Sequence, residues 1–192
     1  METPKKYRHK KPFVSYTQWA FTQDEIKRML EACETDADHL MILLAYRYGF
    51  RRDDIAKLKV ANINYVDKTL TYYEHKKNAD RTIPLEDDVI SELKRYTSTM
   101  DKKRVYLLPF NDGSSCWIHL QDICTLAGIP VPAGRTGRPF HSLRGSCIKY
   151  RQSIGWTLNQ CAALIGDTPE TVMKHYATTS TDELKALMAV NK

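Results

Sequence analysis

Helical spacing of apolar residues begins near position 22. Thr22 and Glu25 stand three positions apart, as in a capping box, where each side chain accepts a hydrogen bond from the other residue's backbone N–H group. Ile26, Met29 and Leu30 follow at intervals that place them on one face of a helix. We therefore predict an amphipathic helix that starts at Thr22.

The segment that follows is more apolar. Residues 40–46 form the longest unbroken apolar run of the chain, which indicates a buried helix, and Gly49 can end this helix in a left-handed conformation. Asp53 or Asp54 is then expected to open another short helix. The pattern predicts a buried helix that leads directly into another short helix.

From position 61 the spacing changes to that of β-strands. Residues 62–65 and 69–73 are rich in β-branched and aromatic side chains and are separated by a turn at 67–68. A second turn is expected at 77–80, before a strand at 81–84. Three short antiparallel strands follow from this order.

Helical patterns return in the second half of the chain. The predicted helices span 87–96, 114–126, 141–151, 157–165, a short segment after the Thr168-Pro169 cap, and a final amphipathic helix at 180–191. Residues 129–139 form a loop rich in glycine and proline. The expected fold class is α+β and mainly helical, with a small three-stranded antiparallel sheet.

Length and composition indicate one globular domain. The chain has 192 residues, of which 42% are hydrophobic and 27% charged, and its longest apolar run is far shorter than a membrane span. The N-terminus lacks the apolar stretch of a secretory signal, so we expect an intracellular, cytoplasmic protein with no membrane contact. We expect a basic arm at 1–18 and a domain at 19–192.

The charge is unevenly distributed. The net charge is +6, and the first twelve residues hold five basic side chains against one acid. Such an arm fits a nucleic-acid partner, a solubilising tail or a linker stub.

The cysteines do not indicate a metal site. Five cysteines are an odd number without a Cys-x-x-Cys pair, and the ligand-like spacing of Cys116 and His119 lacks a second pair. Neighbouring acids at 36/38, 53/54 and 87/88 fit helix starts, where they favour the helix dipole. We therefore expect no metal.

Several charged residues suggest an anion site. His141 and Arg144 are three positions apart on a predicted helix, so both can hold one anion, although the pair alone is a weak signal. Arg51 follows the helix-ending Gly49, and Lys76 lies beside the second predicted turn. These positions become informative when they are taken together.

The complete order of motifs resembles a known family. Gly-x-Arg-x-x-Asp at 49–54, the hairpin lysine, His-x-x-Arg at 141–144, and Leu-x-Gly at 164–166 followed by Tyr176 look like the catalytic domain of tyrosine recombinases, the phage integrase family. The resemblance covers Thr22 to Tyr176, nearly the whole chain.

The resemblance implies roles for these residues. Arg51 and Arg144 would clamp the phosphate, Tyr176 would be the nucleophile, and His141 and Lys76 would complete the catalytic set. Lys77 is a rival for the lysine role, because a loop alignment can shift by one residue. Asp54 stands where the family usually has glutamate and would support the site from behind.

The implied activity is site-specific recombination of double-stranded DNA through a 3′-phosphotyrosine intermediate, without cofactor or metal. The expected assembly on DNA is a homo-oligomer, specifically a tetramer, in which the last helix docks into a neighbouring subunit. Packing of that helix on its own domain is the alternative. Strand relaxation of the type IB topoisomerase kind and a noncatalytic DNA-binding or regulatory role are the rival functions.

Two features depart from the family pattern. Asp167 replaces the usual histidine or tryptophan, and a carboxylate there would repel phosphate unless it turned away, took up a proton or paired with Arg51 or Arg144. It could also simply begin the helix at Thr168. The second departure is that we expect the chain to lack the family's separate N-terminal core-binding domain, either as an excised catalytic domain or as a naturally minimal enzyme.

Overall fold

The computed structural model describes residues 19–132, 135–176, 185 and 188–189. Two α-helices come first in this part of the chain. In α1 (Gln23–Ala32) the predicted capping box is confirmed, because the N–H group of Glu25 donates to Thr22 and the N–H group of Thr22 donates back to Glu25. The second helix, α2 (Asp36–Tyr48), is buried along most of its length and ends at Gly49, whose φ is 65°.

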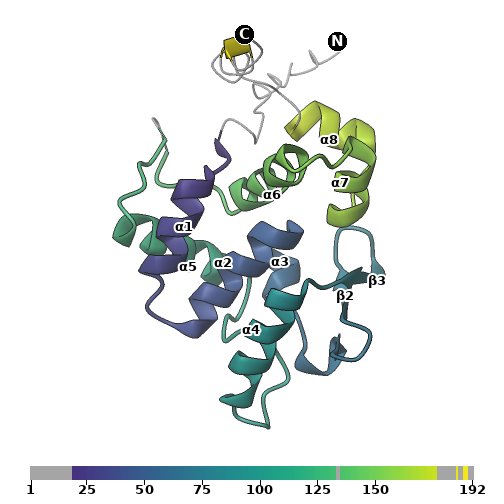
Figure 1. Cartoon of the computed structure of the whole chain (residues 1–192). Coiled ribbons are helices and arrows are strands. Elements are labelled where there is room, and N and C mark those ends of the chain that lie inside the picture. The colour runs from purple at the N-terminus through teal and green to yellow at the C-terminus, as the bar shows by residue number, and fades with distance from the viewer. Residues whose placement is uncertain (1–18, 133–134, 177–184, 186–187, 190–192) are drawn as a thin grey trace, which may run out of the picture.

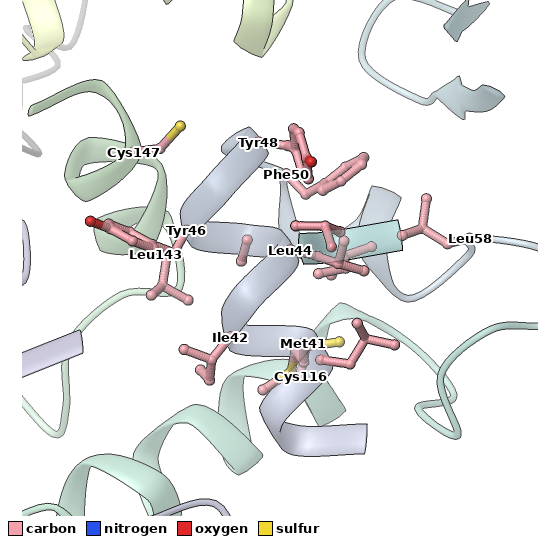
Figure 2. Packing of buried hydrophobic residues seen from close by; sticks show 14 of the residues in the cluster. Met41, Ile42, Leu44, Tyr46, Tyr48, Phe50, Leu58, Cys116, Leu143 and Cys147 are labelled. Carbon is pink, nitrogen blue, oxygen red and sulfur yellow. The ribbon is translucent and has the colours of Figure 1, made fainter. Parts of the chain in front are cut away.

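The core surrounds α2, which packs against α1, α4 (Asp87–Ser98), α5 (Gly113–Leu126) and α6 (His141–Ser153). Figure 2 shows Leu143 and Cys147 of α6 on one side of α2 and Leu58 on the opposite side. Each fully buried leucine of this kind contributes about 2 kcal/mol to folding. The central helix α2 therefore holds in place the segment that follows it, which contains Gly49 and Arg51.

The short helix α3 (Arg52–Ile55) corrects one prediction. Its N-cap is Arg51, without a side-chain capping bond, so neither Asp53 nor Asp54 opens the helix. Both acids lie in the first turn, and Asp54 is buried rather than turned to solvent. The Asp54 carboxylate contacts neighbouring polar groups and does not cap the helix.

The sheet has the predicted three strands in the order β1 (Ile63–Asn64), β2 (Thr69–Glu74) and β3 (Ala79–Pro84), all antiparallel. The expected position of the second turn was wrong. Glu74 pairs with Ala79, so the turn occupies residues 75–78, and the Lys77 N–H group donates to the Glu74 carbonyl over 3.0 Å. The turn comes earlier because Ala79 and Asp80 continue the ladder.

The remaining helices gather on one side of the molecule. Figure 1 shows α6 beside α7 (Leu158–Ile165) and α8 (Pro169–Tyr176), with the β2–β3 hairpin beneath α7. The predicted caps at Thr157 and Thr168 are confirmed. In the part of the chain that is described, none of the helices is long and apolar enough to cross a membrane. The basic arm at 1–18 and most of the expected helix at 180–191 lie outside the described residues.

Candidate active site

Arg51 is held from behind by buried acids. It follows Gly49 at the start of α3, and its Nη1 atom lies 2.5 Å from Oε1 of Glu74, the last residue of β2. Asp54 lies farther away, with 3.8 Å between its Oδ2 atom and the same nitrogen. Both carboxylate side chains are only 2% exposed, so they face the guanidinium in a weakly screened environment.

Arg144 is almost completely buried on α6. Its Nη1 atom donates to the carbonyl oxygen of Gly49 over 2.6 Å, and its Nη2 atom donates to Asp167 over 2.6 Å. A side chain at position 49 would place its Cβ atom 2.7 Å from Ile165 and 3.3 Å from Arg144. Glycine is therefore required both for the helix end and for this close approach.

Asp167 joins the two arginines. Its Oδ2 atom lies 2.6 Å from Nη2 of Arg144 and 3.3 Å from Nη2 of Arg51. Burial by itself would raise the pKa of Asp167, but the hydrogen bond from Arg144 and the charges of Arg144 and Arg51 hold it below its ordinary value. The carboxylate is thus ionised and occupies the position between the guanidiniums, which confirms the expected pairing.

The end of α7 brings Asp167 into this position. Gly166 is left-handed, with φ 71°, and the N–H group of Asp167 donates to the Ala162 carbonyl over 3.0 Å. Arg81 of β3 donates to the carbonyl oxygens of Ala163 and Leu164 and so fixes the same helix end against the sheet. Asp167 does not cap the next helix, because the Thr171 N–H group donates to the Thr168 side chain.

His141 is the first residue of α6 and lies beside the same cluster. Burial, followed by the positive charges of Arg144 and Arg51, lowers its pKa to about 3. The imidazole is therefore neutral at neutral pH. A neutral imidazole can accept a proton, whereas an imidazolium can only donate one.

Lys76 and Lys77 are both exposed in the hairpin turn. The charge of Lys76 lowers the pKa of His141 and of Asp167, which places its ammonium group within electrostatic reach of the cluster. The preceding residue, His75, contacts Asp54 through its backbone N–H group and its imidazole, each at 3.1 Å. Asp54 thus touches both the arginine and the hairpin.

Tyr176 is the last residue of α8, which packs against α6 and α7. This packing places α8 beside α6, which bears Arg144, and beside α7, whose C-terminal end leads to Asp167. The side chain of Tyr176 lies outside the described part of the chain.

Three contributors were absent from the sequence-based set: Glu74, His75 and Arg81. Glu74 had a detectable signal, because it continues the buried alternation of Leu70 and Tyr72 along β2, yet it is an acid. A carboxylate at a buried strand position requires a cationic partner. His75 and Arg81 carried no comparable pattern, since their partners are distant in sequence.

A groove of about 820 Å³ opens beside the cluster, between α3, α5 and the loop before α6. Its lining includes Arg51, Arg52, Arg135 and His141, with Trp117 as an aromatic wall and Asp53 as an acid. Basic groups with an aromatic face suit a phosphate backbone and its bases.

The chain has no clustered metal ligands among residues 19–132 and 135–176. Cys116 is buried in the core, and Nδ1 of His119 lies 2.7 Å from Oδ1 of Asp38. The His119 side chain therefore forms a hydrogen-bond contact with Asp38 of α2.

The curated relatives are tyrosine recombinases. The protein called tyrosine recombinase XerA from Pyrococcus furiosus is 26% identical over 176 residues, which cover 86% of this chain and 59% of that protein. Its namesake from Pyrococcus horikoshii is 30% identical over 88 residues, which cover 46% of this chain and 31% of that protein. The matched regions thus span about one third to three fifths of these relatives.

Solved structures share the fold. The crystal structure of XerA recombinase superposes with a TM-score of 0.74 at 18% identity and covers 90% of this chain and 65% of that one. The catalytic domain of bacteriophage HP1 integrase gives a TM-score of 0.65 at 18% identity and covers 93% and 96%, respectively. These neighbours bear out the mainly helical α+β fold class.

The match to the family profile spans the described site. It covers residues 20–180 and so includes both arginines, the lysine hairpin, His141 and Tyr176. The recombinase relatives and the shared fold agree with that match. The chain therefore belongs to the phage integrase family.

Proposed function

We propose that this chain is the catalytic domain of a site-specific DNA recombinase that cuts and rejoins strands through Tyr176. One observation carries the proposal: the guanidiniums of Arg51 and Arg144 converge on a single anionic oxygen, which Asp167 supplies. A non-bridging oxygen of a phosphodiester has the same charge and accepts the same hydrogen bonds. Planar guanidinium forks recognise such oxygens with high geometric specificity.

The charge balance of the site favours phosphoryl transfer. Negative charge accumulates on the equatorial phosphate oxygens in the transition state, and donors that are already in place stabilise it. Glu74 and the Gly49 carbonyl hold the two arginines before any substrate arrives, so little reorganisation is needed. Asp167 must release part of its hydrogen bonding when phosphate enters.

The proposed cleavage step begins with Tyr176. The phenolic oxygen of Tyr176 attacks phosphorus, the new P–O bond forms, and the bond to the 5′ oxygen breaks. Neutral His141 accepts the phenolic proton. The low pKa of His141 disfavours this proton transfer, and the negative charge of a bound phosphate raises that pKa.

Lys76 completes the proton balance. The leaving 5′ oxygen needs a proton, which the ammonium group of Lys76 donates as general acid. The phosphotyrosine bond conserves the energy of the phosphodiester, and attack by a 5′ hydroxyl restores the strand. Neither nucleotide nor metal enters this sequence of steps.

Double-stranded DNA is the proposed partner. In this proposal, the groove that Arg52, Arg135 and Trp117 line binds the DNA strand that extends from the scissile phosphate. Structural neighbours include lambda integrase as a dimer bound to a core site and XerH recombinase bound to its difH substrate, with TM-scores of 0.61 and 0.67. We extend DNA binding and assembly into a homotetramer to this chain as part of the proposal.

The test is covalent trapping. Nicked suicide duplexes with randomised sequence are incubated with the protein, and adducts that survive denaturation are recovered and sequenced. We expect a protein–DNA adduct with wild type and none with Tyr176→Phe, which removes only the attacking oxygen. Relaxation of supercoiled plasmid without the recovered sequence would favour topoisomerase activity, and the absence of any adduct would favour a noncatalytic relative.

A further inference from the structure

Glu74, the last residue of β2, and His75, the first residue of the turn, attach the lysine hairpin to the segment that bears Arg51. Glu74 bonds to Arg51, and His75 bonds to Asp54, three residues farther along the chain. Lys76 comes directly after this pair. The backbone from which the Lys76 side chain extends is therefore connected by these two contacts to the segment that bears Arg51, one of the two proposed phosphate-clamping arginines.

The His75 ring makes two directed contacts. Its Nδ1 atom lies 3.1 Å from Oδ1 of Asp54, a carboxylate whose side chain is 2% exposed. Its ring also packs edge-to-face against Tyr73, with centroids 5.2 Å apart, and the Tyr73 hydroxyl donates to Asn78 across the turn. The imidazole thus contacts Asp54 and Tyr73, and Tyr73 in turn bonds to Asn78 across the turn.

His75 is not needed for the core. Its side chain is 49% exposed, and its partners are polar or lie on the hairpin itself. A half-exposed side chain that makes two directed contacts contributes more to the position of the groups it contacts than to the free energy of unfolding.

We propose that His75 is a positioning residue that, through Asp54, fixes where Lys76 delivers its proton. The proposal rests on the proposed function, because it needs a strand-cleavage step that Lys76 assists. The lysine side chain has four methylene groups and therefore a fixed maximum reach. The position of its Cα atom and the geometry of the turn thus limit where the ammonium group can lie. Displacement of a catalytic group by about 1 Å can cost a factor of about a hundred in rate.

A substrate with sulfur at the 5′ leaving position separates this role from a structural one. Thiolate leaves without a proton, so a defect in proton delivery disappears with this substrate. We expect His75→Ala to slow single-turnover cleavage of the oxygen substrate by roughly tenfold or more and to cleave the sulfur substrate at nearly the wild-type rate. Glu74→Gln acts through Arg51 and should be slow with both substrates.

Conservative variants test the atom involved. Asparagine can place an amide nitrogen where Nδ1 of histidine lies, whereas glutamine places it near the position of Nε2. We therefore expect His75→Asn to recover most of the rate and His75→Gln to recover little. His119→Ala is the matched control, because that side chain is 43% exposed and also directs Nδ1 at a carboxylate, yet it contacts Asp38 on α2.

The outcomes are distinct. An equal loss on both substrates for His75→Ala, or a sulfur rescue equally strong for Glu74→Gln, would overturn the positioning role while wild-type cleavage still supported the proposed function. The absence of a wild-type adduct on either substrate would reject the proposed function and the role of His75 with it. Sulfur rescue confined to Lys76→Ala and His75→Ala would establish the inference.

Discussion

The carboxylate of Asp167 lies 2.6 Å from Nη2 of Arg144, a guanidinium whose side chain is only 1% exposed. The same oxygen is 3.3 Å from Arg51. Asp167 therefore holds the two arginines together and competes with the phosphate that they are proposed to bind. This arrangement should affect the stability of the fold, the binding of anions and the dependence of stability on pH.

Asp167→Ala should destabilise the fold by about 3 kcal/mol in urea unfolding, because it leaves a buried guanidinium without its carboxylate partner. Inorganic phosphate should stabilise this variant more than wild type, since the vacated position accepts an anion. Glu170→Ala is the control, because Glu170 is exposed on α8. Equal phosphate effects in all three proteins would show that no anion site had opened.

Asp167→His should retain strand cleavage, since the family usually has histidine or tryptophan at this position. Asp167→Ala should cleave more slowly than Asp167→His, because alanine cannot orient either arginine. Adduct yield on a suicide duplex measures both variants.

His141 should destabilise the fold as the pH falls. Its folded pKa is lowered to about 3, while an unfolded histidine titrates near 6.5, so only the unfolded state takes up the proton between these values. The stability of wild type relative to His141→Gln should therefore decrease as pH falls below about 6.5. Urea unfolding across pH 7 to 4 measures the difference, and a pH-independent difference would contradict the buried, neutral imidazole.

Arg144→Lys should not restore what Arg144→Ala loses. Arg144 uses two separate nitrogens for Gly49 and Asp167, and a single ammonium group cannot reproduce that fork. Loss of one such donor costs about 3 kcal/mol of transition-state stabilisation, or about two orders of magnitude in rate. Single-turnover cleavage measures both variants, and near-wild-type cleavage by the lysine variant would argue against bidentate recognition.

Lys76 and Lys77 can be distinguished by the sulfur substrate. Lys76→Ala should cleave the oxygen substrate slowly and the sulfur substrate at nearly the wild-type rate, whereas Lys77→Ala should affect both little. The charge of Lys76 acts on His141 and Asp167, which favours this assignment. Sulfur rescue of Lys77→Ala instead would shift the general acid by one residue.

The basic arm, Lys5 to Lys11, should contribute affinity without sequence specificity. Each phosphate contact releases counterions from DNA, so removal of the arm should flatten the dependence of affinity on salt. Fluorescence anisotropy at several salt concentrations measures the slope on specific and random duplexes. An unchanged slope would show that the arm does not touch DNA.

Local features of the fold could be predicted from the sequence. The caps at Thr22 and Thr157 and the left-handed end at Gly49 depend on residues within one helical turn, so neighbouring side chains determine them. The three strands follow from their β-branched and aromatic side chains, although the second turn lies at 75–78 and not at the expected 77–80. The order of short motifs was sufficient to indicate the family.

The sequence named pairing with Arg51 or Arg144 as one of several possibilities for Asp167, but it did not reveal the contacts of Glu74 and His75 that hold the site together. Asp167 lies 23 residues from Arg144 and 116 from Arg51, and Glu74 lies 23 from Arg51, so packing of the hairpin and α7 must bring them into contact. The same packing explains why Asp54 is buried against His75 instead of capping α3. Local propensities act over a few residues, whereas the ion pairs that orient the arginines form only after distant elements have docked.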